Sequence, residues 1–380
     1  MSATNSVSVT NSAAWLTAPY SDLTVGDAPY TSAAAGELVI RNRAVAVNPL
    51  DEVKQSTGNL MYSWLPHPSI LGEDVAGEVV EVGAGVTGFA VGDRVIAYAV
   101  GMEKNRNHSA EGGFQLFSVV RADLASPIPD DLAFESAVVL PLAVSTAASA
   151  LFQSDQLGLR HPTAKTTTEE PREWVVVWGG STSVGSNAIQ LAVAAGYSVL
   201  ATASPQNHDR MRALGAQHVV DYRSPSAVRE VVALLRDEQL AGVFAVGTGS
   251  AEPAVAIASA LGCRRVSLAS PSVSMSTLPR RPRAWLSLAR FGVTIASRMG
   301  ALQLRCLRRG IRARFVWGSS LMTNEVGPML WQEFLPNALA EGRYATVPRA
   351  EIVGSGLTSI QPALDALRRG ASATKFVVTL

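Results

Sequence analysis

The sequence predicts an α/β protein in which a β-rich domain precedes a doubly wound parallel sheet, and three observations support this. The first third of the chain consists of short β-branched runs separated by Gly, Asn and Pro. From Trp174 onward, apolar strand-like runs alternate with helical ones. A length of 380 residues exceeds one ordinary core, and 47% hydrophobic against 17% charged residues indicates a well-buried chain.

The charge and cysteine content exclude several classes of protein. A net charge of +1 provides no global field to gather nucleic acid or an anionic membrane. Cys263 and Cys306 can form one bridge at most, so neither a disulfide framework nor a four-thiolate zinc site is expected. The first eleven residues show no signal peptide, and the apolar stretch 284–304 carries two interior arginines. We therefore expect a cytoplasmic protein with no nucleic-acid partner and no membrane attachment.

The β-rich part ends near residue 130. Strands are expected over 37–47, 78–82, 94–100 and 114–121, with chain reversals in the glycine-rich segment 83–92. A helical pattern follows over 134–152. The polar segment 155–172 is then expected to form a surface connection.

The second half has the alternation typical of a parallel sheet. The run 174–178 (WVVVW) predicts a strand buried on both faces, and the amphipathic run 186–195 predicts the helix after it. Further strands are expected over 197–203, 217–220 and 242–246, with helices over 206–214 and 227–235.

The turn from Gly179 to Gly185 (GGSTSVG) indicates a dinucleotide site. A glycine-rich turn that opens a helix lets backbone N–H groups approach a pyrophosphate, and the helix N-terminus adds partial positive charge. The spacing departs from G-x-G-x-x-G, because Thr182 and Ser183 occupy the middle of the turn. A tight strand-to-helix connection in another kind of α/β protein is the alternative.

The end of the second strand favours NADP(H) over NAD(H). A site specific for NAD places an acid there for the ribose 2′-hydroxyl, but residues 201–207 (ATASPQN) contain none. Hydroxyl, amide and basic groups suit a 2′-phosphate, with Arg212 as a further contributor. Ser204 and Asn207 could instead cap the next helix, and the two roles are compatible.

Several stretches together resemble the medium-chain dehydrogenase/reductase superfamily, in its order and over nearly the whole chain. These stretches are NPLD (48–51) with Lys54, ILGEDVAG (70–77), VGAGVTGFAVGDRV (82–95), LPLAVSTAASAL (140–151), the glycine turn, LGA (214–216), VDY (220–222) and TKFVV (374–378). The resemblance implies a GroES-like catalytic domain over 1–140, a Rossmann domain over 141–325, and a return to the catalytic domain over 326–380, with the active site in the cleft between the domains.

The resemblance also implies a metal-free site. Zinc-dependent members carry a Cys near the position of Asn48 and a His-Glu pair after the glycine at Gly72. This chain has no Cys there and reads Glu73-Asp74. Without thiolate or imidazole ligands, a catalytic zinc ion lacks its first shell.

Within the zinc-independent branch, the chain looks most like the stand-alone enoyl reductases that act in trans on fungal polyketide synthases. The resemblance implies roles near the nicotinamide or substrate for Asp51, Lys54 and Thr146. The cofactor-binding set that it implies is Asn48, Asp51, Gly180, Ser181, Thr182, Ser183, Val184, Ser204, Asn207, Tyr222, Ser267 and Lys375. Trp64, Phe315 and Trp317 are candidates for an apolar substrate pocket, although core packing would explain them equally.

Reduction of an activated C=C bond needs a donor for the developing enolate and a source of one proton. Lys54 is the candidate donor or positioning group. Its alternative is a solvated lysine that anchors ribose or pairs with Asp51 or Glu52. Tyr62 is a candidate proton donor or a wall residue, and water is a third proton source.

The segment 253–324 contains no acid but twelve arginines. These are Arg264, Arg265, Arg280, Arg281, Arg283, Arg290, Arg298, Arg305, Arg308, Arg309, Arg312 and Arg314. If they share a face, they could receive an acidic carrier protein or its phosphopantetheine arm. A solvated helix face and a membrane-adsorbed helix are the alternatives.

An NADPH-dependent enoyl reductase of secondary metabolism is therefore the favoured function. A quinone or carbonyl reductase on the same fold is the runner-up, because a fold does not fix the substrate. A non-catalytic NADPH-binding protein is the third hypothesis. The sequence does not determine the oligomeric state.

Overall fold

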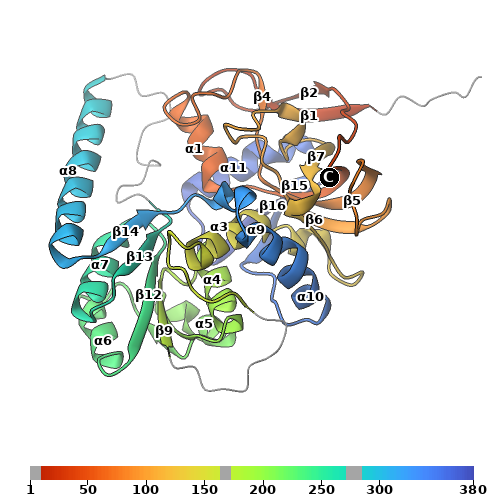
Figure 1. The fold of residues 1–380 in the computed structure, drawn as a ribbon. Coiled ribbons are helices and arrows are strands. Elements are labelled where there is room, and N and C mark those ends of the chain that lie inside the picture. Colours follow the sequence, from red (N-terminus) through yellow and green to blue (C-terminus); the bar gives the residue numbers. More distant parts are fainter. Residues whose placement is uncertain (1–9, 163–172, 271–284) are drawn as a thin grey trace, which may run out of the picture. The chain divides into compact units, whose positions relative to one another are not determined.

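The computed structural model describes residues 10–162, 173–270 and 285–380, which form two compact units. The first unit comprises residues 1–138, 352–369 and 376–380, and the second comprises 139–351 and 370–375. Each unit has its own sheet system (Figure 1).

The first unit is built on an antiparallel sheet whose long central strand is β3 (Glu37–Ala46). The order is β15-β16-β3-β5-β6-β8, and β7 also pairs with β3. The partners are β5 (Asp74–Val82), β6 (Arg94–Tyr98), β7 (Phe117–Arg121), β8 (Ala125–Pro127), β15 (Arg349–Ser355) and β16 (Thr374–Thr379). A smaller sheet has the order β2-β1-β4, with β1 at Asn11–Leu16, β2 at Thr24–Ala28 and β4 at Ser69–Ile70.

The C-terminal strand belongs to the sheet of the first unit, although about 330 residues separate it from its partner along the chain. Strand β16 pairs antiparallel with β3, with Val377 opposite Ala46 and Thr379 opposite Ala44. Helix α1 (Pro49–Thr57) follows β3, and α11 (Ile360–Arg369) packs on α1. Arg368 pairs with Glu52 at 2.9 Å across these two helices.

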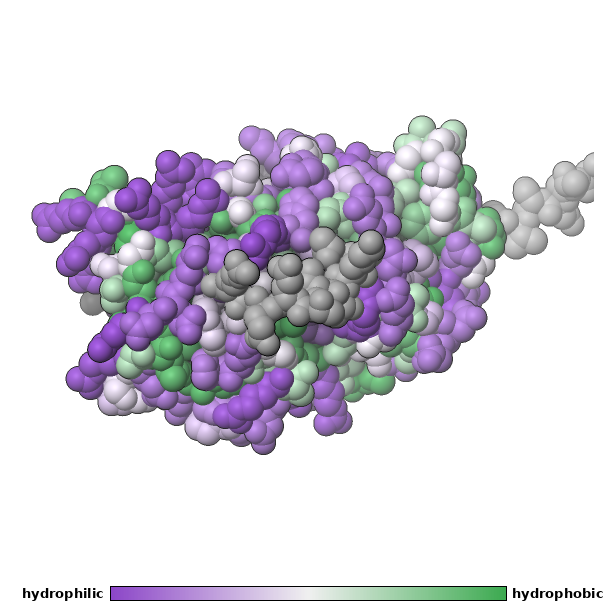
Figure 2. Space-filling view, turned by 60° about the horizontal axis from the view of Figure 1, so that its bottom comes forward, coloured by the Kyte–Doolittle hydropathy of each residue, from purple (hydrophilic) through white to green (hydrophobic). Residues whose placement is uncertain are grey.

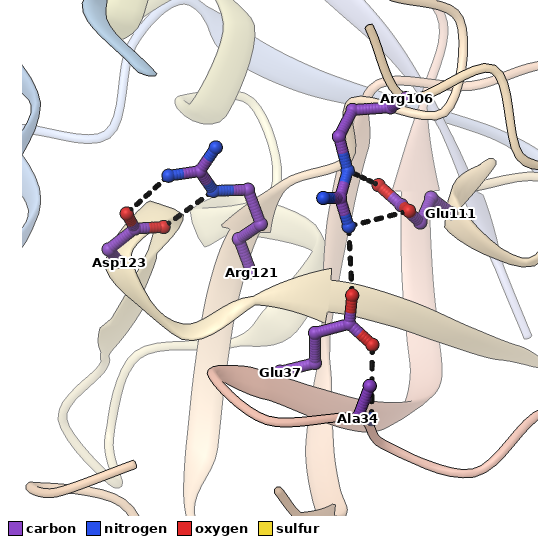
Figure 3. A network of polar contacts seen from close by, with 6 residues as sticks. All are labelled: Ala34, Glu37, Arg106, Glu111, Arg121 and Asp123. Atoms are coloured by element: carbon purple, nitrogen blue, oxygen red, sulfur yellow. Dashed lines mark hydrogen bonds and ion pairs between the residues drawn. The ribbon is translucent and has the colours of Figure 1, made fainter. Parts of the chain in front are cut away.

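An ion-pair network fastens the loop after β6 to β3 (Figure 3). The Arg106 guanidinium makes two bonds of 2.8 Å to the Glu111 carboxylate and a third, also of 2.8 Å, to Glu37. Glu37 in turn accepts the backbone N–H of Ala34 at 3.1 Å. A bidentate guanidinium–carboxylate pair fixes geometry as well as charge, so this network holds the loop in register with the sheet.

The second unit contains a six-stranded parallel sheet in the order β11-β10-β9-β12-β13-β14. Renumbered within the unit, this order is 3-2-1-4-5-6, the doubly wound arrangement of a dinucleotide-binding sheet. Its strands are β9 (Glu173–Trp178), β10 (Ser198–Thr202), β11 (His218–Val220), β12 (Gln239–Ala245), β13 (Arg265–Leu268) and β14 (Arg312–Phe315). The connecting helices are α4 (Ser183–Ala194), α5 (His208–Ala213), α6 (Ala227–Leu234), α7 (Ala251–Ala260) and α8 (Trp285–Arg309). The predicted fold class, a GroES-like β-rich part and a Rossmann sheet, is confirmed.

The helix expected over 134–152 is two helices, α2 (Phe134–Ala137) and α3 (Pro141–Phe152). Pro141 occupies the first turn of α3, where its missing N–H and fixed φ are tolerated, so the chain restarts there. By length and hydropathy this stretch could cross a membrane. However, 78% of it is buried inside the protein, as in the core helix of a globular domain.

Residues 326–351 lie in the second unit, whereas the sequence places the return to the catalytic domain at 326. This segment contains α9 (Val326–Pro328), a π-helix (η6, Met329–Phe334) and α10 (Leu335–Ala340). Tyr344 donates its hydroxyl to Asn187 Oδ1 at 2.7 Å, and Ala345 N donates to Gln190 Oε1 at 2.8 Å. These bonds attach the segment to α4 and explain the difference.

Candidate active site

The turn between β9 and α4 can be built only with glycine at two positions. Gly179 has φ of +93°, and a Cβ atom there would lie 2.3 Å from the carbonyl oxygen of Val246. A Cβ atom on Gly185 would lie 2.2 Å from the carbonyl oxygen of Gly179. Separations under 3 Å are steric clashes, so the turn is as tight as a dinucleotide cradle requires.

Thr182 caps helix α4 from within this turn. Its hydroxyl accepts the N–H of Gly185 at 3.0 Å and donates to the carbonyl of Gly179 at 2.8 Å. Ser186 Oγ donates to the carbonyl of Gly180 at 2.9 Å. The side chain of Thr182 therefore shapes the turn, and the direct phosphate contact expected of it stays a prediction.

The backbone of the turn offers donors to an anion. In the described parts of the chain, the N–H groups of Ser181, Ser183 and Val184 have no hydrogen-bond acceptor, and all three residues are partly exposed. They stand at the N-terminus of the twelve-residue helix α4, where the helix dipole favours negative charge. Open donors beside a turn with no room for side chains fit the pyrophosphate of a nicotinamide dinucleotide.

Ser204 and Asn207 follow the carboxyl end of β10. Asn207 Nδ2 donates to Ser204 Oγ at 3.2 Å, and Asn207 N donates to the carbonyl of Ser204 at 2.9 Å. Ala203 N donates to the carbonyl of Val220 at 3.1 Å, which joins the ends of β10 and β11. Both side chains are largely buried, so the hydroxyl and the amide are held in fixed positions at this edge of the sheet.

Arg223 is a candidate nucleotide-binding residue that the sequence reasoning missed. It follows β11, and its guanidinium lies 5.6 Å from the centre of the Tyr222 ring, which is 43% exposed. Arg212, the basic residue expected to contribute, is paired with Asp209 at 2.9 Å instead. The basic residue next to the VDY motif was the available signal, because it stands where the third strand ends.

Three further expected site residues, Ser267, Thr146 and Lys375, donate side-chain hydrogen bonds to partners within the second unit. Ser267 is fully buried in β13, and its hydroxyl donates to Gln156 Oε1 at 2.8 Å, which gives no support for a cofactor contact. Thr146 Oγ1 donates to the carbonyl of Leu142 at 2.8 Å and keeps its lone pairs for accepting. Lys375 Nζ is buried and donates to the carbonyl of Val139 at 3.3 Å.

Asn48 and Asp51 build a buried network in the first unit. Asp51 accepts two backbone N–H groups, from Asn48 at 2.8 Å and from Gly72 at 3.0 Å. Asn48 Nδ2 donates to Asp74 Oδ2 at 2.7 Å. The network ties the start of α1 to the segment before β5, and the cofactor contacts expected of Asn48 and Asp51 stay predictions.

Lys54 is fully buried, so the alternative of a solvated lysine is wrong. Its ammonium donates to the carbonyls of Gly58 at 3.2 Å and Tyr62 at 3.1 Å, and burial lowers its pKa. Glu52 pairs with Arg368 instead. Lys54 therefore holds the loop that presents Tyr62, whose ring is 2% exposed and whose pKa is raised by burial and by nearby Glu73.

The three candidate pocket residues fall in different units. Trp64 lies in the first unit, where its indole N–H donates to the carbonyl of Met102 at 2.9 Å and its ring meets Tyr62 edge-on at 5.4 Å. Phe315 and Trp317 lie in the second unit with ring centres 6.3 Å apart, and Phe315 is 47% exposed.

At the positions where the resemblance places the ligands of zinc-dependent members, this chain has side chains that are already hydrogen-bonded within the protein. Asp74 accepts from Asn48, while Glu73 is fully buried and its Oε1 accepts the Tyr98 hydroxyl at 3.3 Å. Within the described ranges, no three His, Cys, Asp or Glu side chains are grouped to hold a metal ion. This donor set does not fit a catalytic zinc ion, which needs three protein ligands.

Comparisons with known proteins agree with this fold. Residues 34–130 match the alcohol dehydrogenase GroES-like domain. Dehydrogenase pigH of Monascus ruber is 44% identical over 373 residues, which cover 98% of this chain and 100% of that protein. Trans-enoyl reductase himH of Aspergillus japonicus is 38% identical over 377 residues, 98% of each chain.

Two solved structures have the same fold. CurK enoyl reductase superposes with a TM-score of 0.70 at 18% identity, over 97% of this chain and 99% of that chain. A mycobacterial protein complexed with NADPH superposes with a TM-score of 0.64 at 20% identity, over 97% of this chain and 100% of that chain. The chain belongs to the medium-chain dehydrogenase/reductase superfamily and is an oxidoreductase with a nicotinamide cofactor.

Proposed function

We propose that this protein is an NADPH-dependent enoyl reductase that transfers hydride to an activated C=C bond in secondary metabolism. The observation that carries the proposal is the glycine turn with three open N–H groups in a sheet of order 3-2-1-4-5-6. The end-to-end similarity to a trans-enoyl reductase supports the choice of reaction.

NADP(H) is preferred over NAD(H) because of the groups after β10 and β11. No acid stands between Thr202 and His208 to accept the 2′-hydroxyl of an NAD ribose. Ser204, Asn207 and the exposed guanidinium of Arg223 offer donors that suit a 2′-phosphate.

The chain's own groups supply orientation and a proton. Bound NADPH supplies the hydride. Lys54 uses two of its three ammonium protons on carbonyl oxygens, so one donor remains for a developing enolate. Tyr62, whose backbone Lys54 holds, carries a phenol kept protonated by burial and is the candidate proton donor to the α-carbon.

The reaction is proposed to proceed without zinc. By the resemblance, members that use zinc carry its ligands at the positions of Asn48, Glu73 and Asp74. Here the side chain of Asn48 is hydrogen-bonded to that of Asp74 instead. Elemental analysis of active enzyme should find no stoichiometric zinc, and a chelator should leave turnover unchanged. Zinc at one ion per chain, lost together with activity, would refute this part.

We further propose that α8 receives an acidic carrier protein that delivers the substrate. Arg298, Arg305 and Arg308 are exposed at helical spacings of seven and three, and Leu307 is 76% exposed beside them. At the left edge of Figure 2, where α8 lies in Figure 1, hydrophilic and hydrophobic residues alternate on the surface. Arg280, Arg281 and Arg283 lie outside the described residues, while Arg265 and Arg314 bond within the second unit.

Reversing the charge of this surface tests the docking proposal. The triple variant R298E/R305E/R308E should raise KM for a carrier-bound enoyl thioester at least about tenfold, because Arg pairs with carboxylate and phosphate. KM for a small soluble enoyl thioester should not change. Equal KM values for the carrier-bound substrate in both proteins would show that the arginines form a solvated face.

A quinone or carbonyl reductase is the second candidate. Solved structures with this fold include quinone oxidoreductases, and likeness of fold leaves the acceptor open. The decisive experiment follows NADPH oxidation with enoyl thioesters, enones, quinones and aldehydes. We expect turnover with the enoyl thioesters. Turnover of quinones alone would overturn the proposal, and tight NADPH binding without any turnover would indicate a non-catalytic protein.

A further inference from the structure

The first unit contains a group of buried acids at one junction. Glu73 lies between Gly72, whose N–H bonds to Asp51, and Asp74, whose carboxylate bonds to Asn48. The carbonyl of Glu73 accepts Ala99 N at 2.9 Å, which fixes its backbone. Asp51, Glu73 and Asp74 are each fully buried, and Glu103 is nearly so.

These acids differ in the donors that they receive. Asp51 accepts two backbone N–H groups and Asp74 accepts an amide N–H, and such bonds stabilise the ionised form. Among the residues that the structure describes, Glu73 receives only the Tyr98 hydroxyl on Oε1, at 3.3 Å. Its Oε2 is buried without a hydrogen-bond partner, and no ion pair to Glu73 occurs among the described side chains. Of Asp51, Asp74 and Glu73, Glu73 therefore receives the weakest stabilisation as an anion.

The acids around Glu73 oppose its ionisation, and the Tyr98 hydroxyl donates a hydrogen bond that favours it. Burial raises the pKa of Glu73 well above its ordinary value of 4.5, and Asp51, Glu103 and Asp74 raise it further. The Tyr98 bond acts in the opposite direction and is the smallest of these effects. Tyr62 and Tyr98 stay neutral because burial raises their own pKa values.

We propose that Glu73 is a positioning residue that stays protonated at neutral pH within this group of buried acids. A neutral carboxylic acid adds no further negative charge beside Asp51 and Asp74 in the same buried region. It also keeps Tyr98 bonded and leaves Tyr62 in a fixed environment beside the acids. The proposal does not depend on the proposed reaction, because it concerns the protonation state of the folded protein.

The direct test is an infrared spectrum of the full chain at pH 7. The carboxylic-acid C=O band should be present in the wild-type protein and absent from Glu73→Gln, which mimics the neutral acid in shape. Glu78→Gln is the matched control, because Glu78 lies on β5, which begins just after Glu73, and pairs with Arg43 near the surface. A band that persists in Glu73→Gln, or no band in the wild type, would overturn the proposal.

Stability against pH gives a second, independent readout. Between 4.5 and the raised pKa, the folded state holds one proton more than the unfolded state, so stability falls as pH rises. The unfolding equilibrium constant of the wild type, relative to that of Glu73→Gln, should therefore rise up to about tenfold per pH unit in this window. Glu73→Ala should unfold more readily than Glu73→Gln at every pH. If the ratio of the two unfolding equilibrium constants, wild type over Glu73→Gln, stays constant from pH 5 to 9, Glu73 is ionised in the folded protein.

Discussion

In the proposed function, Ser204 and Arg223 are the residues on which nucleotide choice depends. The hydroxyl and the guanidinium follow neighbouring strands whose ends are joined by a backbone hydrogen bond. No acid stands between Thr202 and His208, although Asp221 immediately follows β11. The sequence predicted Ser204 and Asn207 because the second strand ends there without an acid, and it predicted Tyr222 from the family resemblance. It did not predict Arg223, because a basic residue in a loop carries no pattern until its neighbours are known.

Ser204→Asp should shift preference toward NADH. A carboxylate at this position repels a 2′-phosphate and accepts the 2′-hydroxyl of an NAD ribose. The ratio of kcat/KM for NADPH to that for NADH should fall by about tenfold or more, equivalent to about 1.4 kcal/mol. Ser355→Asp, on the exposed end of β15, is the control. An unchanged ratio would show that the 2′-phosphate binds elsewhere.

Arg223→Ala should weaken NADPH binding selectively. Because the guanidinium would donate charge-assisted hydrogen bonds to the 2′-phosphate, Kd for NADPH should rise at least about tenfold. Calorimetry with each nucleotide measures this. Kd for NADH should stay the same, and an equal loss for both nucleotides would assign Arg223 to the fold instead.

The glycine turn is the element on which the second unit's site depends. The strands and helices around it lie close to the predicted ranges, because continuous apolar runs and helical periodicity are strong signals. Helix α1 was not predicted, because its buried residues include Asp51, Lys54 and Gln55 rather than an apolar stripe. Polar burial of this kind depends on hydrogen-bond partners distant in sequence, which a local pattern cannot show.

Gly179→Ala should destabilise the protein by at least about 2 kcal/mol more than Gly247→Ala. Both glycines have nearly the same φ, +93° and +97°, so a side chain strains the backbone similarly at each. Only at Gly179 does the new Cβ atom clash, at 2.3 Å from the Val246 carbonyl. Chemical denaturation of the two variants separates the backbone strain from the steric clash. Equal losses in the free energy of unfolding would mean that the turn relaxes to accommodate the new Cβ atom.

At the scale of the whole molecule, two units are built from a chain that leaves the first sheet and returns to it. The order of motifs along the sequence was enough to predict both kinds of sheet. It could not fix the return point, because the bonds from Tyr344 and Ala345 to α4 join segments about 155 residues apart. The sequence could not identify the hydride acceptor either, because a fold does not determine the substrate.

The destination of the hydride tests the proposed function most directly. Reaction of the enzyme with an enoyl thioester and NADPH deuterated at the transferable position should give a saturated thioester with one deuterium on the β-carbon. Mass spectrometry and NMR locate this label. A product that carries deuterium on the former carbonyl carbon, or an unreduced C=C bond after NADPH is consumed, would contradict enoyl reduction.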